Sequence, residues 1–73
     1  MKKFRNIPNK INVILDVFGD DDKLMTREIA KRLRDRGYEV RAEHLGMFIR
    51  FEMLHKYLGY ERRYDKCNLY YKI

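Results

Sequence analysis

The chain contains no Ser, no Gln and no Trp, and it has one Cys and one Pro. Without Ser it has no serine nucleophile, and its four Gly residues form no phosphate-binding Gly-rich loop. A lone Cys excludes an internal disulfide and is typical of proteins from a reducing compartment. We therefore expect a protein that is not an enzyme and carries no cofactor.

Long apolar runs are also missing. No stretch approaches the roughly 20 apolar residues that a helix needs to cross a bilayer. The basic start of the chain, residues 1–6, lacks the apolar core of a signal peptide. We expect a cytoplasmic protein without a membrane partner.

Soft metal ligands are few. They are His44, His55 and Cys67. On one helix the two His residues would be separated by about 16 Å of rise, too far to share an ion. The acidic run 20–22 is more typical of a solvated turn than of a cation site, so the sequence predicts no metal site.

What the chain has in quantity is charge and apolar side chains. Lys and Arg number 17 against 11 Asp and Glu, which gives a net charge of +6, and 45% of the residues are hydrophobic. This composition predicts one globular domain over residues 1–73, with 1–6 as a basic arm. A basic folded surface favours polyanions such as DNA. The alternative is that the charge serves solubility alone.

Apolar periodicity and turn residues predict an α+β fold of three helices followed by a β-hairpin. The predicted helices span Pro8–Phe18, Arg27–Arg36 and Ala42–Leu58, and the predicted strands span Tyr60–Tyr64 and Leu69–Ile73. Thr26 is expected to cap the second helix and Gly37 to end it. Leu24 and Met25 are expected to form a short extended segment.

The predicted third helix carries two apolar stripes, whereas a surface helix needs one. Leu45, Phe48 and Ile49 form the first stripe, which we assign to the core. Met47, Phe51, Leu54 and Leu58 form the second stripe, which we assign to a homodimer interface. The alternative is that the first helix and the hairpin cover both stripes within one chain.

Polar and basic side chains gather where a recognition helix and a hairpin would meet DNA, although each alone is more often a solvated residue. The candidate DNA-binding residues are Thr26, Arg27, Arg41, Glu43, His44, Arg50, Arg62, Arg63, Lys66 and Asn68. Arg50 is the best candidate for a bidentate contact with guanine. The hairpin tyrosines would suit base stacking, but strand alternation favours a core position for Tyr71, with Leu69 and Ile73.

These residues carry a family resemblance. The segments Thr26–Ala30, Ala42–Gly46, Ile49–Arg50, Leu58–Arg63 and Tyr70–Ile73 resemble those of the winged helix-turn-helix DNA-binding domain superfamily. The resemblance implies a small transcriptional regulator that binds double-stranded DNA, with the third helix in the major groove and the hairpin, or wing, on the backbone. It also implies that the extended segment Leu24–Met25 pairs with the hairpin. The third helix is longer and more apolar than is usual in that superfamily. Since the superfamily includes protein-binding members, the alternative function is a protein-protein interaction module in a replication or transcription assembly.

Overall fold

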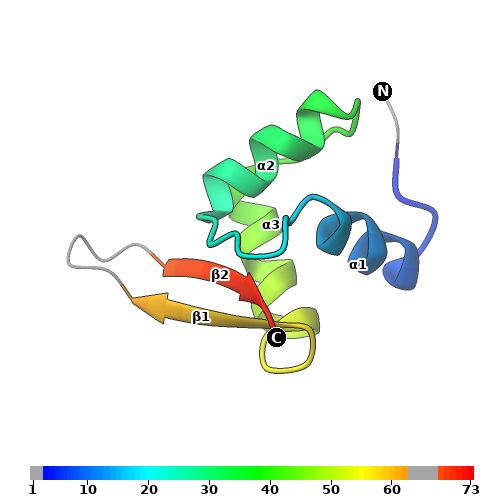
Figure 1. Cartoon of the computed structure of the whole chain (residues 1–73). Helices are drawn as coiled ribbons and strands as arrows, with labels where there is room; N and C mark the ends of the chain where they lie inside the picture. The colour runs from blue at the N-terminus through cyan, green and yellow to red at the C-terminus, as the bar shows by residue number, and fades with distance from the viewer. Residues whose placement is uncertain (1–2, 63–67) are drawn as a thin grey trace.

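The computed structural model of the chain describes residues 3–62 and 68–73. Over these residues the predicted α+β class is confirmed, because three helices are followed by a two-stranded antiparallel hairpin. Figure 1 shows α3 below α2 and beside α1, behind the segment that joins those two helices, with the hairpin reaching out beyond the helices. None of the helices described is long and apolar enough to span a bilayer.

Helix α1 spans Ile7–Asp16 and begins as the sequence indicates. Its N-cap is Asn6, whose side chain accepts a hydrogen bond from the Asn9 N–H at 2.8 Å. The helix ends two residues before the predicted Phe18. The N–H groups of Val17 and Phe18 donate to carbonyls only three residues back, because both side chains turn into the core there.

Helix α2 spans Thr26–Asp35, and Thr26 is its first helical residue, so the predicted Thr26 cap is wrong. The capping position belongs to Met25, whose N–H donates to the Glu28 carboxylate at 3.2 Å. The predicted stop at Gly37 is confirmed. Gly37 has φ 93°, and its N–H and that of Tyr38 donate back to carbonyls of the last turn.

The third helix is shorter than predicted and does not reach Leu58. Helix α3 spans Ala42–Phe48 and continues into η1, a turn of π-helix spanning Ile49–Met53. Leu54 is extended and His55 has φ 66°, so the chain reverses direction immediately after η1. The His55 N–H closes this reversal by donating to the Leu58 carbonyl at 2.8 Å.

The hairpin consists of β1, Leu58–Arg62, and β2, Asn68–Lys72. The antiparallel register pairs Leu58 with Lys72 at one end and Arg62 with Asn68 at the other. The expected pairing of the extended segment is confirmed, since Leu24 and Tyr70 exchange two backbone hydrogen bonds of 2.9 and 2.8 Å. This single β-bridge therefore ties the segment before α2 to the hairpin.

The predicted side-chain alternation in β2 needs a correction. Tyr70, rather than Tyr71, joins the hydrophobic core, whereas Leu69 is buried outside it and Ile73 is exposed. The bridge to Leu24 explains the difference, because it places the Tyr70 side of the ribbon against the helices. Tyr71 lies instead across Gly59 on the other face of the ribbon.

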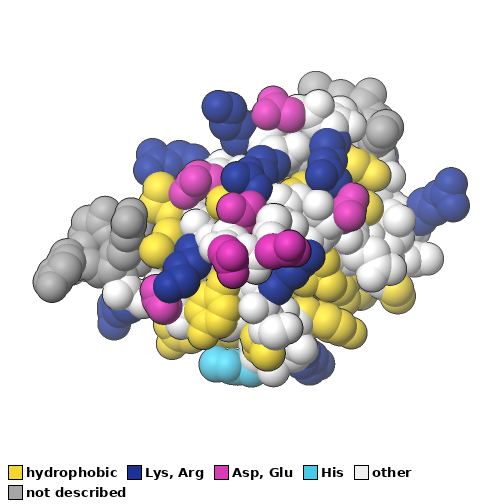
Figure 2. Space-filling model, in the orientation of Figure 1, with side chains coloured by type: hydrophobic (Ala, Val, Ile, Leu, Met, Phe, Trp, Pro, Cys, Tyr) yellow, Lys and Arg dark blue, Asp and Glu magenta, His cyan; other side chains and the backbone are white. Residues whose placement is uncertain are grey.

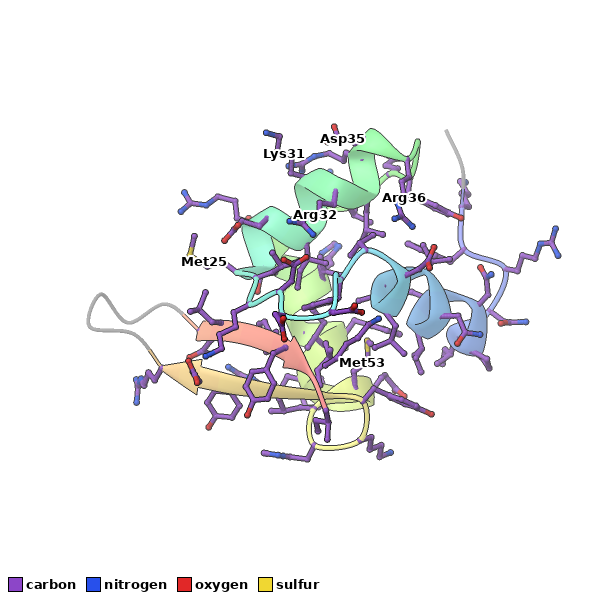
Figure 3. The ribbon with its side chains drawn as sticks, viewed as in Figure 1. Met25, Lys31, Arg32, Asp35, Arg36 and Met53 are labelled. Atoms are coloured by element: carbon purple, nitrogen blue, oxygen red, sulfur yellow. The ribbon has the colours of Figure 1, made fainter. Side chains whose placement is uncertain are left out.

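One core joins all the elements, and no buried polar side chain lies among the described residues. The residues that form it are Ile14, Val17, Phe18, Leu24, Ile29, Ala30, Leu33, Leu45, Ile49, Met53, Leu58 and Tyr70. Figure 3 shows Met53 in the interior, and Arg32 and Arg36 turned from α2 toward α1. These two arginines pair with Asp22 at 2.7 Å and Asp16 at 2.8 Å, which fastens α2 to the preceding segment.

Candidate nucleic-acid interface

The exposed face of α3 and η1 meets the hairpin and the start of α2 in a shallow hollow of about 440 Å³. The residues that line this hollow are Thr26, Ala42, Glu43, Gly46, Met47, Arg50, Asn68 and Tyr70. Four of them are sequence-predicted DNA-binding residues, and they come from four different elements, α2, α3, η1 and β2. The fold thus gathers polar groups that are up to 42 positions apart, from Thr26 to Asn68 (68 − 26), in the chain.

A second hollow of about 490 Å³ continues this surface along the hairpin. It is lined by Arg50, Leu54, Tyr60, Arg62, Asn68 and Tyr70. Because Arg50, Asn68 and Tyr70 border both hollows, the two form one surface, which we call the Arg50 surface. It adds Arg62 to the predicted residues that the structure brings together.

Arg50 is positioned by the residues on either side of it. Ile49 and Met53 are fully buried, so η1 is held against the core while Arg50 projects to the exposed side. Neither Arg50 nor Arg62 forms an ion pair with any described residue. π-Helical turns are found frequently at functional sites, and two uncompensated guanidinium groups beside one would attract an anion.

Three cations elsewhere in the described residues are paired with carboxylates. Besides the two pairs on α2, Lys23 pairs with Glu61 at 3.0 Å. Figure 2 shows Lys and Arg interspersed with Asp and Glu on the face that carries α1, α2 and the segment between them. A face of mixed sign gives little net attraction to a polyanion.

Gly46 lies where α3 passes the start of α2. A Cβ at Gly46 would meet the Thr26 methyl carbon at 3.7 Å, which is ordinary van der Waals contact. The packing therefore does not require glycine at this position.

The structure does not bring all the predicted DNA-binding residues together. Arg41 and His44 line a different hollow of about 330 Å³, on the side of α3 that faces α1. Arg27 is exposed in the first turn of α2 and borders neither part of the Arg50 surface. Arg63 and Lys66, which the sequence predicts to contact DNA, lie outside the described residues, as does Cys67.

The predicted dimer residues also separate. Leu58 is fully buried in β1, so its assignment to an interface is wrong, because the chain reverses at His55 before reaching it. Leu54 is half-buried, whereas 59% of Met47 and 70% of Phe51 remain exposed. Met47 borders the Arg50 surface and so lies beside the DNA-binding candidates, whereas Phe51 lines neither of its hollows.

Sequence reasoning missed Lys10 of α1. Its amine lies 4.3 Å from the centroid of the Phe48 ring and 5.2 Å from that of Phe4, in cation–π geometry. Burial lowers the pKa of the Lys10 ammonium below the usual lysine range. Helical spacing could have indicated this position, because Lys10 lies one turn before the buried Ile14 and therefore on the inner side of α1.

Among the described residues, no group of three or more His, Cys, Asp or Glu side chains is arranged to hold a metal ion. Comparison of the chain with protein-family models, with curated proteins and with solved structures found no match. The functional argument therefore depends on the geometry and charge of the chain itself.

Proposed function

We propose that the chain is a winged-helix protein that binds double-stranded DNA through the Arg50 surface and regulates transcription. One observation carries the proposal: Thr26 from α2, Arg50 from η1, and Arg62 and Asn68 from the hairpin border one continuous exposed surface. Helix, helix and ribbon are the elements with which winged helices hold a duplex.

In this mode the exposed face of α3 and η1 enters the major groove. The planar guanidinium of Arg50 suits the O6 and N7 acceptors of guanine, and the Glu43 carboxylate suits the N4 donor of cytosine. Thr26, Arg62 and Asn68 flank this face and suit phosphate oxygens, which would fix the orientation of the protein. Glu43 repels phosphate, so its presence favours a base contact over a backbone contact.

The test is a titration of fluorescently labelled duplex DNA with the full chain at low and at moderate salt, followed by selection from a random duplex pool. We expect binding that weakens steeply with salt, because phosphate contacts release counterions. Selection should enrich sites with guanine at one position. A failure to bind any duplex at low salt contradicts the proposal. Equal affinity for all sequences would instead indicate a sequence-independent architectural DNA-binding protein.

The exposure of Met47 and Phe51 favours a second candidate function, an interaction module that binds another protein. A 70% exposed Phe next to a 59% exposed Met is costly to leave in water and suits an apolar partner. The duplex titration separates the two candidates. Absence of DNA binding at low salt would favour the interaction module.

We also propose that a second copy of the chain covers Phe51. Dimers with two-fold symmetry are the commonest assembly, and a dimer of winged helices matches a palindromic DNA site. A chain of 73 residues builds a small core, so association would add stability. The oligomeric state in solution tests this part of the proposal.

A further inference from the structure

The hollow of about 330 Å³ that Arg41 and His44 line lies between the N-terminal segment, α1 and the start of α3. It is lined by Lys3, Phe4, Lys10, Glu39, Val40, Arg41, His44 and Leu45. None of these residues borders the Arg50 surface, so the two sites are separate. Three basic side chains and one His line the hollow together with a single carboxylate, that of Glu39, which makes the hollow electropositive.

The Lys10 ammonium is the most unusual group in this hollow. It lies over the Phe48 and Phe4 rings and forms no ion pair with any described residue. Burial has removed part of its hydration, and the contacts it makes in the described part of the chain are with the two ring faces. An anion beside Lys10 would restore the missing interaction with a full charge.

The hollow is also held in shape. The Phe4 ring stacks on that of Tyr38, with centroids 4.8 Å apart and ring planes 7° from parallel. This contact fastens the N-terminal segment, which contributes Lys3, to the turn between α2 and α3. Phe4, Val40 and Leu45 give the hollow an apolar wall beside its cations, so it offers both an ionic and an apolar contact.

We propose that this hollow binds a small organic anion, in which a phosphate or carboxylate group contacts Lys10 and Arg41 and a planar apolar part packs against Val40 and Leu45. Its volume is at the lower end of the range for small-molecule sites, about 300–1,000 Å³. A bare inorganic anion would leave the apolar wall uncovered. The proposal stands independently of DNA binding, since it involves different residues.

The test is a heteronuclear NMR titration of the full chain, with adenosine monophosphate as a planar anion, inorganic phosphate as the bare anion and adenosine as the neutral planar group. We expect adenosine monophosphate to shift the amide signals of Val40, Arg41 and His44 with a Kd below about 1 mM. The other two probes should bind at least about tenfold more weakly, because each makes half of the contacts. The pKa of Lys10 should rise on binding, since an adjacent anion favours the charged form.

Substitutions connect these shifts to the proposed contacts. Lys10→Gln should weaken adenosine monophosphate binding about tenfold or more, whereas Lys31→Gln should leave it unchanged. Lys31→Gln is the matched control because it removes the same charge, but from the outer face of α2 (Figure 3). If Lys10→Gln fails to fold, Arg41→Gln carries the test, since Arg41 is exposed and its side chain makes no capping hydrogen bond.

Three results would overturn the proposal. The first is no saturable shift with adenosine monophosphate, and the second is equal weakening by Lys10→Gln and Lys31→Gln. The third is a shift of Val40, Arg41 and His44 by duplex DNA alone, which would assign the hollow to backbone phosphate. Loss of duplex binding at the Arg50 surface, by contrast, leaves these predictions as they are.

Discussion

Tyr71 lies across Gly59 on the opposite strand of the hairpin. The two residues pair directly in the register, and a Cβ at Gly59 would come within 2.7 Å of the Tyr71 Cζ and hydroxyl oxygen. A methyl group at position 59 would therefore have to displace the Tyr71 ring. Its own backbone φ is not in the left-handed region.

Gly59→Ala should destabilise the protein by about 1 kcal/mol, because the Tyr71 ring must move to admit the methyl group. In a Tyr71→Ala background the same substitution should be neutral or stabilising, since Gly in a strand is otherwise unfavourable. Urea unfolding of the two single variants and the double variant measures this coupling. An equal cost of Gly59→Ala in both backgrounds would show that the ring is not the cause.

Gly46→Ala should stabilise the protein by about 1 kcal/mol. The position is helical, and the new methyl group would meet Thr26 at an ordinary distance. Gly37→Ala is the informative contrast, because φ 93° at Gly37 makes the same change unfavourable by about 1 kcal/mol. Thermal unfolding of both variants checks the opposite signs; a loss of stability in Gly46→Ala would count against this packing of α2 on α3.

Asp22 should make stability depend on pH in the acid range. The hydrogen bond from the Arg32 guanidinium, and then that from the Gly19 N–H, hold the pKa of Asp22 below its usual range. A carboxylate whose folded pKa is lowered contributes stability that is complete above its unfolded pKa, about 3.9, and is lost as the pH falls through the folded value.

The measurement is the urea midpoint from about pH 6 down to about pH 2. Asp22→Asn should lower the midpoint at the upper end of this range and reduce its fall toward acid pH. Asp20→Asn, a change at an exposed residue of the same turn, should keep the slope of the original chain. If the two variants show the same slope, the Arg32 contact does not control the titration.

Arg50→Ala and Arg62→Ala should affect DNA binding differently. Arg50→Ala should cost about 1–3 kcal/mol on a selected site and relax the preference at one base pair. Arg62→Ala should weaken all duplexes alike and reduce the salt slope by about one. Lys31→Ala on the outer face of α2 is the control for net charge. Equal loss on selected and random duplexes for Arg50→Ala would remove Arg50 from base readout.

Phe51→Ser should separate association from folding. Because 70% of Phe51 is exposed, the substitution should change the free energy of unfolding of the monomer by no more than about 0.5 kcal/mol. If a second copy covers it, the dimer dissociation constant should rise at least about tenfold. Sedimentation equilibrium measures this constant, with Ile73→Ser, 74% exposed at the end of the chain, as the control. A monomeric original chain would contradict the dimer directly.

Much of the fold follows from local sequence. Asn6 and Pro8 start α1, Gly37 ends α2, and the tyrosine-rich segments pair as a hairpin. Each of these assignments depends on residues close together in the chain, where capping and turn preferences act. The pairing of Leu24 with the hairpin was expected from the resemblance rather than from any local signal.

The sequence also indicated two apolar sides on the third helix, but the end predicted for that helix, Leu58, was wrong. The apolar spacing runs on past Met53, and no Pro or Gly marks a stop before Gly59. The helix ends because Leu54 and the left-handed His55 reverse the chain, and the reversal places Leu58 in the core. A non-glycine residue with positive φ persists only where the surrounding structure holds it, so no local preference predicts it.

By itself the sequence determined the element types, most of their boundaries and the basic character of the surface, because capping, periodicity and charge are properties of neighbouring residues. Only the tertiary structure decided which cations share a site. It joined Arg50 to Arg62 and Asn68, and it placed Arg41 and His44 with Lys10 in a separate hollow. The physical reason is that these groupings depend on how α1 and the hairpin pack on opposite sides of α3, which is set by long-range burial of the common core.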